Sequence, residues 1–390
     1  MTQTLKNHPT QVDSSEQALR IARRWRRLLP LGLASSLPQL LRGEDHVDYR
    51  YEYYAEDSSR MTVQTHSVYF EQKLIDSIIA KGDLNYDGVS GATPTGTHNS
   101  SGQVNLTHMK DIRRSISLQF DGKLGNNTLT PGFAYSKESD YQSYGVSLND
   151  AFEFNEKNTT LQFGISHNFD SVRQSNEIDW SNKQSTEGFI GLSQLLSPKT
   201  ILNAAFTFGN DSGYLSDPYR LAEYVPTGFP FGIGIPERRP AHRNKEIAFT
   251  SVTQYFDDLN ASLEGSYRFY HDSYGVFAHT VGLTWHQWLV DKHLMVEPTF
   301  RFSEQSAASF YATSFSGPFS TNPGGYHSSD YRLSELYTMY FGAQVTVLVT
   351  DWVHLTAGYH RYGMYGLDGK TSSDMYPKAN IFNVGLSFIW

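Results

Sequence analysis

Apolar and polar side chains alternate with a period of two along most of the chain after residue 45. Between 353 and 360, apolar residues occupy the odd positions and polar or small residues the even ones, and 116–120 and 161–166 repeat this pattern. Because successive side chains of a strand point to opposite faces, the period predicts strands with one apolar and one polar face. About sixteen such segments are expected, near 47–56, 61–74, 77–89, 112–124, 127–139, 142–155, 158–172, 184–196, 200–212, 245–258, 260–273, 276–290, 293–305, 333–349, 352–364 and 379–390.

The connections between these segments alternate in length. Every second one is short and polar: 125–127, 155–158, 197–199, 257–260, 291–292 and 350–351. The intervening connections are mostly long, near 90–111, 173–183, 213–244, 306–332 and 365–378. Short turns on one side and long loops on the other are typical of an outer-membrane barrel. The expected fold is therefore all-β, a transmembrane antiparallel up-and-down β-barrel of about sixteen strands with short periplasmic turns and long extracellular loops.

The last segment carries the most regular alternation. Its even positions are all apolar and end on an aromatic residue: Phe382, Val384, Leu386, Phe388 and Trp390. This pattern resembles the terminal strand that the barrel assembly machinery recognises, so that machinery and outer-membrane lipid are expected partners. The alternative is an ordinary amphipathic edge strand.

The first 43 residues differ from the rest of the chain. They contain seven basic and two acidic residues, and a basic cluster at Arg23–Arg27 precedes a modestly apolar stretch. This layout is typical of a secretory signal, with an amphipathic or disordered arm as the alternative. The expected organisation is a signal peptide or basic leader over 1–43 and one barrel over 44–390. No apolar run is long enough for a transmembrane helix.

Composition narrows the function. The chain has no cysteine, which excludes disulfides, thiolate metal sites and thiol catalysis, and its net charge of −8 argues against nucleic-acid binding. Its modest hydrophobic content, 39%, fits strands that turn only one face to lipid. Aromatic residues near strand ends suit the girdles of such a barrel: Tyr49, Tyr51, Tyr53, Tyr135, Tyr144, Tyr267, Trp285, Trp352 and Tyr359.

Charged residues on the polar face are the candidate pore lining: Lys81, Asp83, Asp87, Glu264, Arg268, His286, Glu297 and Arg301. A two-residue turn at 291–292 would place His286 opposite Glu297 and Gly282 opposite Arg301. The preceding hairpin, turning near Tyr274, would place Glu264 near His286 and Arg268 near Gly282. An acidic row would then lie beside a basic row. The two rows either orient passing solutes or pair with each other across strands.

Sequence motifs give little support for metal binding or catalysis. The segment Asp83–Gly88 begins like a calcium loop, but Pro94 occupies the position that requires Glu. No nucleotide, zinc-protease or hydrolase motif is present. No metal, cofactor or catalytic residue is expected, and the chain is not expected to be an enzyme. The alternative enzyme would be a barrel-embedded surface hydrolase that uses His279 or His360.

Several short motifs resemble those of a bacterial family called domain of unknown function 3570. They are Ser90-Gly-Ala-Thr-Pro94, Lys157-Asn-Thr-Thr160, Leu195-Leu-Ser-Pro-Lys-Thr200, Ser212-Gly-Tyr-Leu-Ser-Asp-Pro-Tyr219, Gly265-Ser-Tyr-Arg-Phe-Tyr270 and Gln305-Ser-Ala-Ala-Ser-Phe-Tyr311. The resemblance implies an exported barrel in the outer membrane of a Gram-negative bacterium, and it implies no activity or substrate.

The expected function is an outer-membrane channel or transporter for small polar solutes or ions. One alternative is a structural scaffold for a periplasmic or extracellular partner, for example in an extracytoplasmic redox or maturation system. The surface hydrolase is the second alternative.

Overall fold

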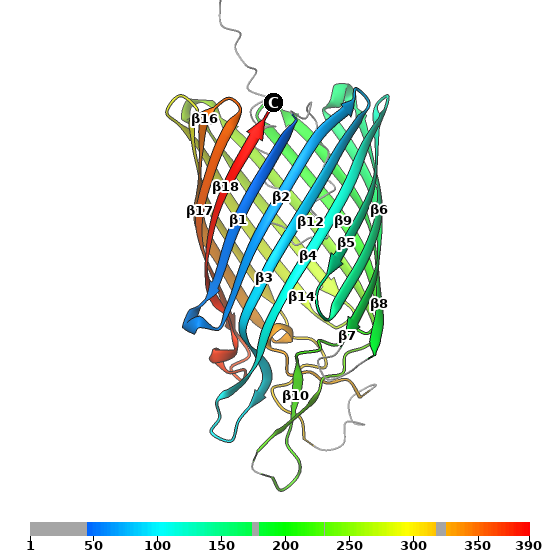
Figure 1. Ribbon diagram of the computed structural model, residues 1–390, viewed down its shortest axis with the longest axis vertical. Helices are drawn as coiled ribbons and strands as arrows, with labels where there is room; N and C mark the ends of the chain where they lie inside the picture. The colour runs from blue at the N-terminus through cyan, green and yellow to red at the C-terminus, as the bar shows by residue number, and fades with distance from the viewer. Residues whose placement is uncertain (1–44, 174–178, 230, 317–324) are drawn as a thin grey trace, which may run out of the picture.

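The computed structural model describes residues 45–173, 179–229, 231–316 and 325–390. The expected leader over 1–43 lies outside these residues. Within them, sixteen strands form one closed barrel (Figure 1). The barrel strands are β1 His46–Glu56, β2 Met61–Ile75, β3 Ile78–His98, β4 Val104–Leu124, β5 Asn127–Lys137, β6 Tyr141–Phe154, β7 Thr159–Arg173, β8 Trp180–Ser197, β9 Thr200–Gly213, β12 His242–Phe256, β13 Ala261–Asp272, β14 Phe277–Leu289, β15 Leu294–Gln305, β16 Leu336–Thr350, β17 Val353–Gly366 and β18 Lys378–Ile389.

The remaining elements are short. A two-stranded sheet, β10 Leu221–Tyr224 and β11 Ile233–Pro236, lies in the loop between β9 and β12. Single 3₁₀ turns occur at η2 Asp57–Ser59, η3 Asn155–Lys157, η4 Asp257–Leu259, η7 Tyr331–Leu333 and η8 Ser373–Met375. None of the helices in the described part of the chain has the length and hydropathy needed to cross a membrane.

Antiparallel pairing of chain neighbours builds the barrel, and the pairing of β1 with β18 closes it. This closing pair runs from His46 opposite Ile389 to Glu56 opposite Ala379. Apart from this closure, only the β9–β12 pair joins barrel strands that are not consecutive, because β10 and β11 form a separate sheet. Closure gives every barrel strand two partners and leaves no unpaired edge.

The two faces of the wall have the inverse polarity of a soluble barrel. Apolar side chains such as Phe206, Leu283 and Val384 are exposed on the outside, whereas the neighbouring Thr207 and Thr284 are buried on the inside. An apolar outer surface is stable only against lipid, and a polar inner surface requires water or polar partners. The molecule is therefore a transmembrane β-barrel.

The strand expectations are confirmed with one substantial exception. The connection expected over 90–111 is wrong, because β3 continues to His98 and β4 already begins at Val104. The added part of β3 carries Thr93, Thr95 and Thr97. These side chains are buried, and other loops of the protein cover them, for example Arg220 at Thr93. Because this part of β3 is polar, alternation of apolar and polar residues does not predict it as a strand.

The turn between β14 and β15 is longer than expected, but the pairing of the two strands is the expected one. It spans 290–293 instead of two residues, with positive φ at Val290, Asp291 and Lys292. Its centre is nevertheless unchanged, so Gly282 lies opposite Arg301 as expected.

Candidate solute site beneath the extracellular loops

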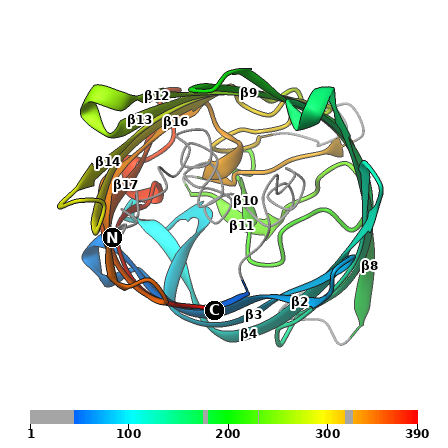
Figure 2. The same ribbon diagram turned by 90° about the horizontal axis from the view of Figure 1, so that it is seen from above.

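Two long loops lie at the end of the barrel opposite the short turns. We call them the lid: residues 214–241 between β9 and β12, and residues 306–335 between β15 and β16, apart from the undescribed positions. Seen along the barrel axis, β10 and β11 of the lid lie within the outline of the ring (Figure 2), and β10 lies beyond the ends of the neighbouring wall strands (Figure 1). The loops pair through their backbones, since the Val225 N–H donates to Phe315 O at 2.7 Å. Arg238 and His327 exchange two such bonds of 2.9 Å each.

A buried ionic cluster joins the two loops. At its centre is Asp330, which is 1% exposed. Arg332 Nε donates to Asp330 Oδ1 at 2.9 Å, and an Arg239 amino group donates to Asp330 Oδ2 at 2.7 Å. Arg220 Nε lies 3.7 Å from Asp330 Oδ1, and Arg239 Nε lies 2.7 Å from Glu237 Oε1. With Asp217, which pairs with Arg332, the cluster holds three carboxylates and three guanidinium groups.

The cluster shifts the pKa values of its carboxyl groups in different directions. Burial disfavours the charged form of Asp330, but Arg332, Arg220 and Arg239 outweigh it and hold the pKa of Asp330 well below its usual range. Arg332 and Arg220 likewise lower the pKa of Asp217 against the effect of burial. Burial raises the pKa of Glu237 despite the nearby Arg239.

The lid is attached to opposite walls of the barrel. Arg220 donates to Pro94 O and, at 3.0 Å, to Thr93 Oγ1, both on β3. The other lid loop packs Phe310 and Leu333 against Val276 and its neighbours in the turn between β13 and β14. In the closed order of the barrel, β3 and β13 are eight strands apart in either direction. The lid therefore crosses the extracellular mouth.

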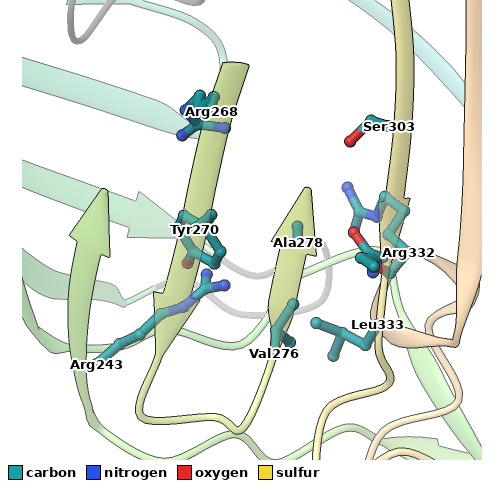
Figure 3. Close-up of a pocket in the computed structure, with 9 residues that line it drawn as sticks. Arg243, Arg268, Tyr270, Val276, Ala278, Ser303, Arg332 and Leu333 are labelled. Carbon is teal, nitrogen blue, oxygen red and sulfur yellow. The ribbon is translucent and has the colours of Figure 1, made fainter. Parts of the chain in front are cut away.

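A cavity of about 240 Å³ lies beneath the lid, against β12 to β15. Figure 3 shows Arg243, Arg268 and Tyr270 on one side of it and Ser303 and Arg332 on the other. The complete lining is Arg243, Arg268, Tyr270, Val276, Ala278, Ser303, Gln305, Arg332 and Leu333.

Asp272 fixes one side of this cavity. This carboxylate is buried and accepts from Arg243 Nε at 2.8 Å and from the Tyr270 hydroxyl at 2.7 Å. It also accepts from the backbone N–H groups of Tyr274 and Val276, at 2.9 and 3.1 Å. These bonds neutralise Arg243, hold the Tyr270 ring in place and shape the turn between β13 and β14.

Arg268 and Arg301 have no such carboxylate. Neither has an acidic oxygen within ion-pair distance among the residues that the structure describes. Arg268 lies over the Tyr270 ring at 5.6 Å, and Arg301 lies over the Tyr340 ring at 5.1 Å. The two guanidinium groups also repel each other. Glu187 attracts Arg268 from beyond ion-pair distance but is itself paired with Lys245 at 2.9 Å, so Arg268 is the cavity arginine without a bonded carboxylate among the described residues.

Other residues expected to line the pore are engaged in pairs. Lys81 is buried against Asp121, and Asp87 Oδ2 accepts from Arg113 Nε at 2.6 Å. Asp83 accepts from Asn85 on the same face of β3. These groups lie on the wall opposite β13, so they do not join the cavity.

The expected neighbour of Glu297 is found, but one register is wrong. His286 Nδ1 lies 3.0 Å from Glu297 Oε1. Glu264, however, lies opposite Thr284, and Arg268 lies opposite Thr280. The turn itself is centred on Tyr274 as expected, so the expected pairing is two residues out for that centre, and His286 and Gly282 are diagonal neighbours of Glu264 and Arg268.

The residues of the two alternative chemistries, the calcium loop and the hydrolase histidines, are all in wall strands. The segment Asp83–Gly88 is part of β3, where Asp83, Asn85 and Asp87 are spaced along one face of an extended strand and do not fold around one point as a calcium loop would. His279 bonds to the Tyr267 hydroxyl on the lipid face, whereas His360 is buried inside the wall and stacks on Tyr340. These two histidines therefore lie on opposite faces of the wall.

The sequence did not single out the lid residues. Its only signal was the length of the two loops and their mixture of charged and aromatic residues. It also missed a rim cluster of Asp111, Glu138 and Asp140, whose carboxylate oxygens lie within 4.8 Å of one another. Phe382, Val384, Phe388 and Trp390 are exposed on the outer surface of the last strand, and their role in assembly stays a prediction.

The fold and the lumen define an outer-membrane β-barrel protein. The chain matches the family described as "Protein of unknown function (DUF3570)" over 32–110, 106–181 and 173–389, and it belongs to that family. No curated protein matches it.

Among solved structures, the barrel is similar to CdiB from Acinetobacter baumannii. The TM-score is 0.52 at 8% identity, over 89% of this chain and 60% of CdiB. A bacterial polysaccharide outer membrane secretin matches with a TM-score of 0.47 at 10% identity, over 90% of this chain and 99% of the secretin. OmpT of Vibrio cholerae matches with a TM-score of 0.43 at 10% identity, over 89% of this chain and 97% of OmpT. At these identities, the CdiB match supports the fold alone.

Proposed function

We propose that this protein is an outer-membrane channel for small polar solutes or ions, and that its lid controls entry from outside the cell. The observation that carries the proposal is the combination of a closed sixteen-strand wall, a polar lumen and a lid anchored to opposite walls. A barrel of this strand number encloses a lumen wide enough for water unless loops obstruct it. Entry then requires the two lid loops to separate or shift.

The interface between the lid loops offers a direct test. Arg238 and His327 form a hydrogen-bonded antiparallel pair, in which Cα atoms are about 5.5 Å apart, within the span of a disulfide. Because the natural chain has no cysteine, the intended disulfide is the only one that can form within a single chain of the double variant R238C/H327C. In planar bilayers we expect low conductance from the oxidised variant and restored conductance after reduction. The single variant R238C is the control, since reduction should leave its conductance unchanged.

Two results would contradict the proposal. The wild-type protein and a lid-shortened variant could both show no conductance for any ion tested, although gel migration shows a folded barrel. Alternatively, the oxidised and reduced double variants could conduct equally, which would exclude lid control.

One observation favours the scaffold as a second candidate. The tip of the β10–β11 hairpin exposes Phe229, Phe231 and Ile233, at 67%, 54% and 55%. The hairpin belongs to the lid and is not part of the lipid-facing wall, and Figure 1 shows β10 beyond the ends of the neighbouring wall strands. If the hairpin holds a protein partner, a stoichiometric partner should co-purify with the wild type and be lost from F229S/F231S. Purification of the wild-type barrel alone would remove this candidate.

A further inference from the structure

We propose that the cavity beneath the lid binds a small oxyanion, a solute that carries a phosphate or carboxylate group, with Arg268 as its main contact. This inference rests on the proposed channel function and names its substrate class. The argument depends on the charge balance around the cavity, the chemistry of its donors and its size.

The charge balance around the cavity shows which arginine side chains have no carboxylate partner. The lid cluster holds three acidic and three basic side chains, and Arg243 is matched by Asp272. Only Arg268 of the cavity arginines has no carboxylate partner among the described residues, and Arg301 near it also has none. Two like charges held close together at a polar wall are stabilised when an anion lies between or beside them.

The net charge of the chain does not oppose this site. Although the chain carries −8 overall, exposed charges more than about 10 Å away are largely screened at physiological salt. The local potential therefore depends on Arg268, Arg301 and the charged groups nearest to them, which include Glu187 in its pair with Lys245. A site of this kind selects anions within a molecule that is acidic as a whole.

The donors suit an oxyanion better than a simple halide. A guanidinium group presents a planar fork of N–H donors that matches two oxygens of a phosphate or carboxylate. Tyr270 lies beneath Arg268, and its hydroxyl is held by Asp272, so the arginine rests on a fixed surface. Ser303 adds a hydroxyl on the opposite side of the cavity, where it lies 2.8 Å from the Thr280 hydroxyl.

The cavity limits the size of the solute. Its volume, about 240 Å³, is smaller than the roughly 300–1,000 Å³ of sites for drug-sized ligands. It therefore fits a compact anion and excludes an oligosaccharide or a peptide from this position.

Binding of inorganic phosphate is the test. Calorimetry on the full-length barrel in detergent, at constant ionic strength, measures affinity without requiring any current. We expect R268Q to weaken phosphate binding about tenfold or more, because a charge-assisted contact is lost, and R268K to fall between R268Q and the wild type. The matched control is K123Q, which removes one positive charge from β4 beside the turn at 125–126 and should bind phosphate as the wild type does.

The outcomes separate the site from the channel. If phosphate does not bind the wild type, or binds R268Q and wild type equally, the site is wrong. If it binds as expected but no variant conducts, the site stands and the channel function fails. Titration with succinate in place of phosphate shows which oxyanion group the site prefers, and loss of both in R268Q supports the shared contact. Heat-modifiable gel migration verifies that each variant is folded.

Discussion

Asp330 is the residue on which the two lid loops converge. Its carboxylate contacts Arg239 from one loop and Arg332 from the other, and it is almost fully buried. Burial of charges is unfavourable unless each has a partner, so the cluster is stable only as a set. Removing one member leaves its partners charged and unsatisfied.

D330N should therefore loosen the lid. Removal of one partner from a buried ion pair costs about 3–5 kcal/mol, and here the loss falls on docking of the loops. We expect higher conductance than wild type and faster trypsin cleavage after Arg238. The control D258N changes an exposed carboxylate in the β12–β13 turn and should alter neither measurement. Unchanged cleavage and conductance in D330N would show that the cluster does not hold the lid closed.

The pKa shifts of the lid carboxylates predict its response to pH. The pKa values of Asp217 and Asp330 are lowered on folding, so their stabilising contribution is complete above the ordinary value of 3.8 and is lost only as pH falls through the lowered values. Glu237 has a raised pKa, so its contribution is lost as pH rises through that value and is regained on acidification. We therefore expect no increase in conductance when pH is lowered from 7.5 to 5. A channel that opens over this range would contradict this assignment.

At the scale of elements, the extended β3–β4 hairpin supports the lid. Gly96 in β3 has φ of +103°, and a Cβ there would lie 2.6 Å from Leu221 O and 2.7 Å from Ser329 O. Both oxygens belong to the lid. The close approach of three backbones at this point requires glycine.

G96A should displace the lid without unfolding the wall. We expect increased conductance and loop cleavage, because a methyl group collides with the backbone of both lid loops. G102A provides a matched control, since Gly102 also has a positive φ, +77°, but has no atom within 4 Å of its added Cβ. The backbone strain of about 1–2 kcal/mol is common to both variants. Equal behaviour of G96A and G102A would mean that the contact is not what positions the lid.

The sequence predicts the wall well and the lid poorly, and the physical reason differs for each. Wall strands face lipid on one side and polar partners on the other, so a period of two appears in the residues themselves. The lid is held by ion pairs between residues far apart in sequence, such as Arg239 and Asp330. The spacing of residues along the chain does not predict such contacts.

At the scale of the whole molecule, the wall and the lid depend on different interactions. The wall is a closed ladder of backbone hydrogen bonds with lipid outside it, and its two ends meet through β1 and β18. The lid adds side-chain contacts at one end only. Stability of the wall should therefore not require the lid.

Replacing 218–238 by a short Gly-Ser linker tests this separation. We expect the shortened protein to keep the heat-modifiable migration of a folded barrel, because none of the deleted residues belongs to a wall strand. Its conductance should exceed that of wild type, since Arg220 and its contact with β3 are removed. Cleavage of the other lid loop should also accelerate, because Asp330 loses Arg220. A shortened barrel that fails to fold would show that the lid contributes to closure of the wall, whereas a folded one with unchanged conductance would place the main barrier deeper in the lumen.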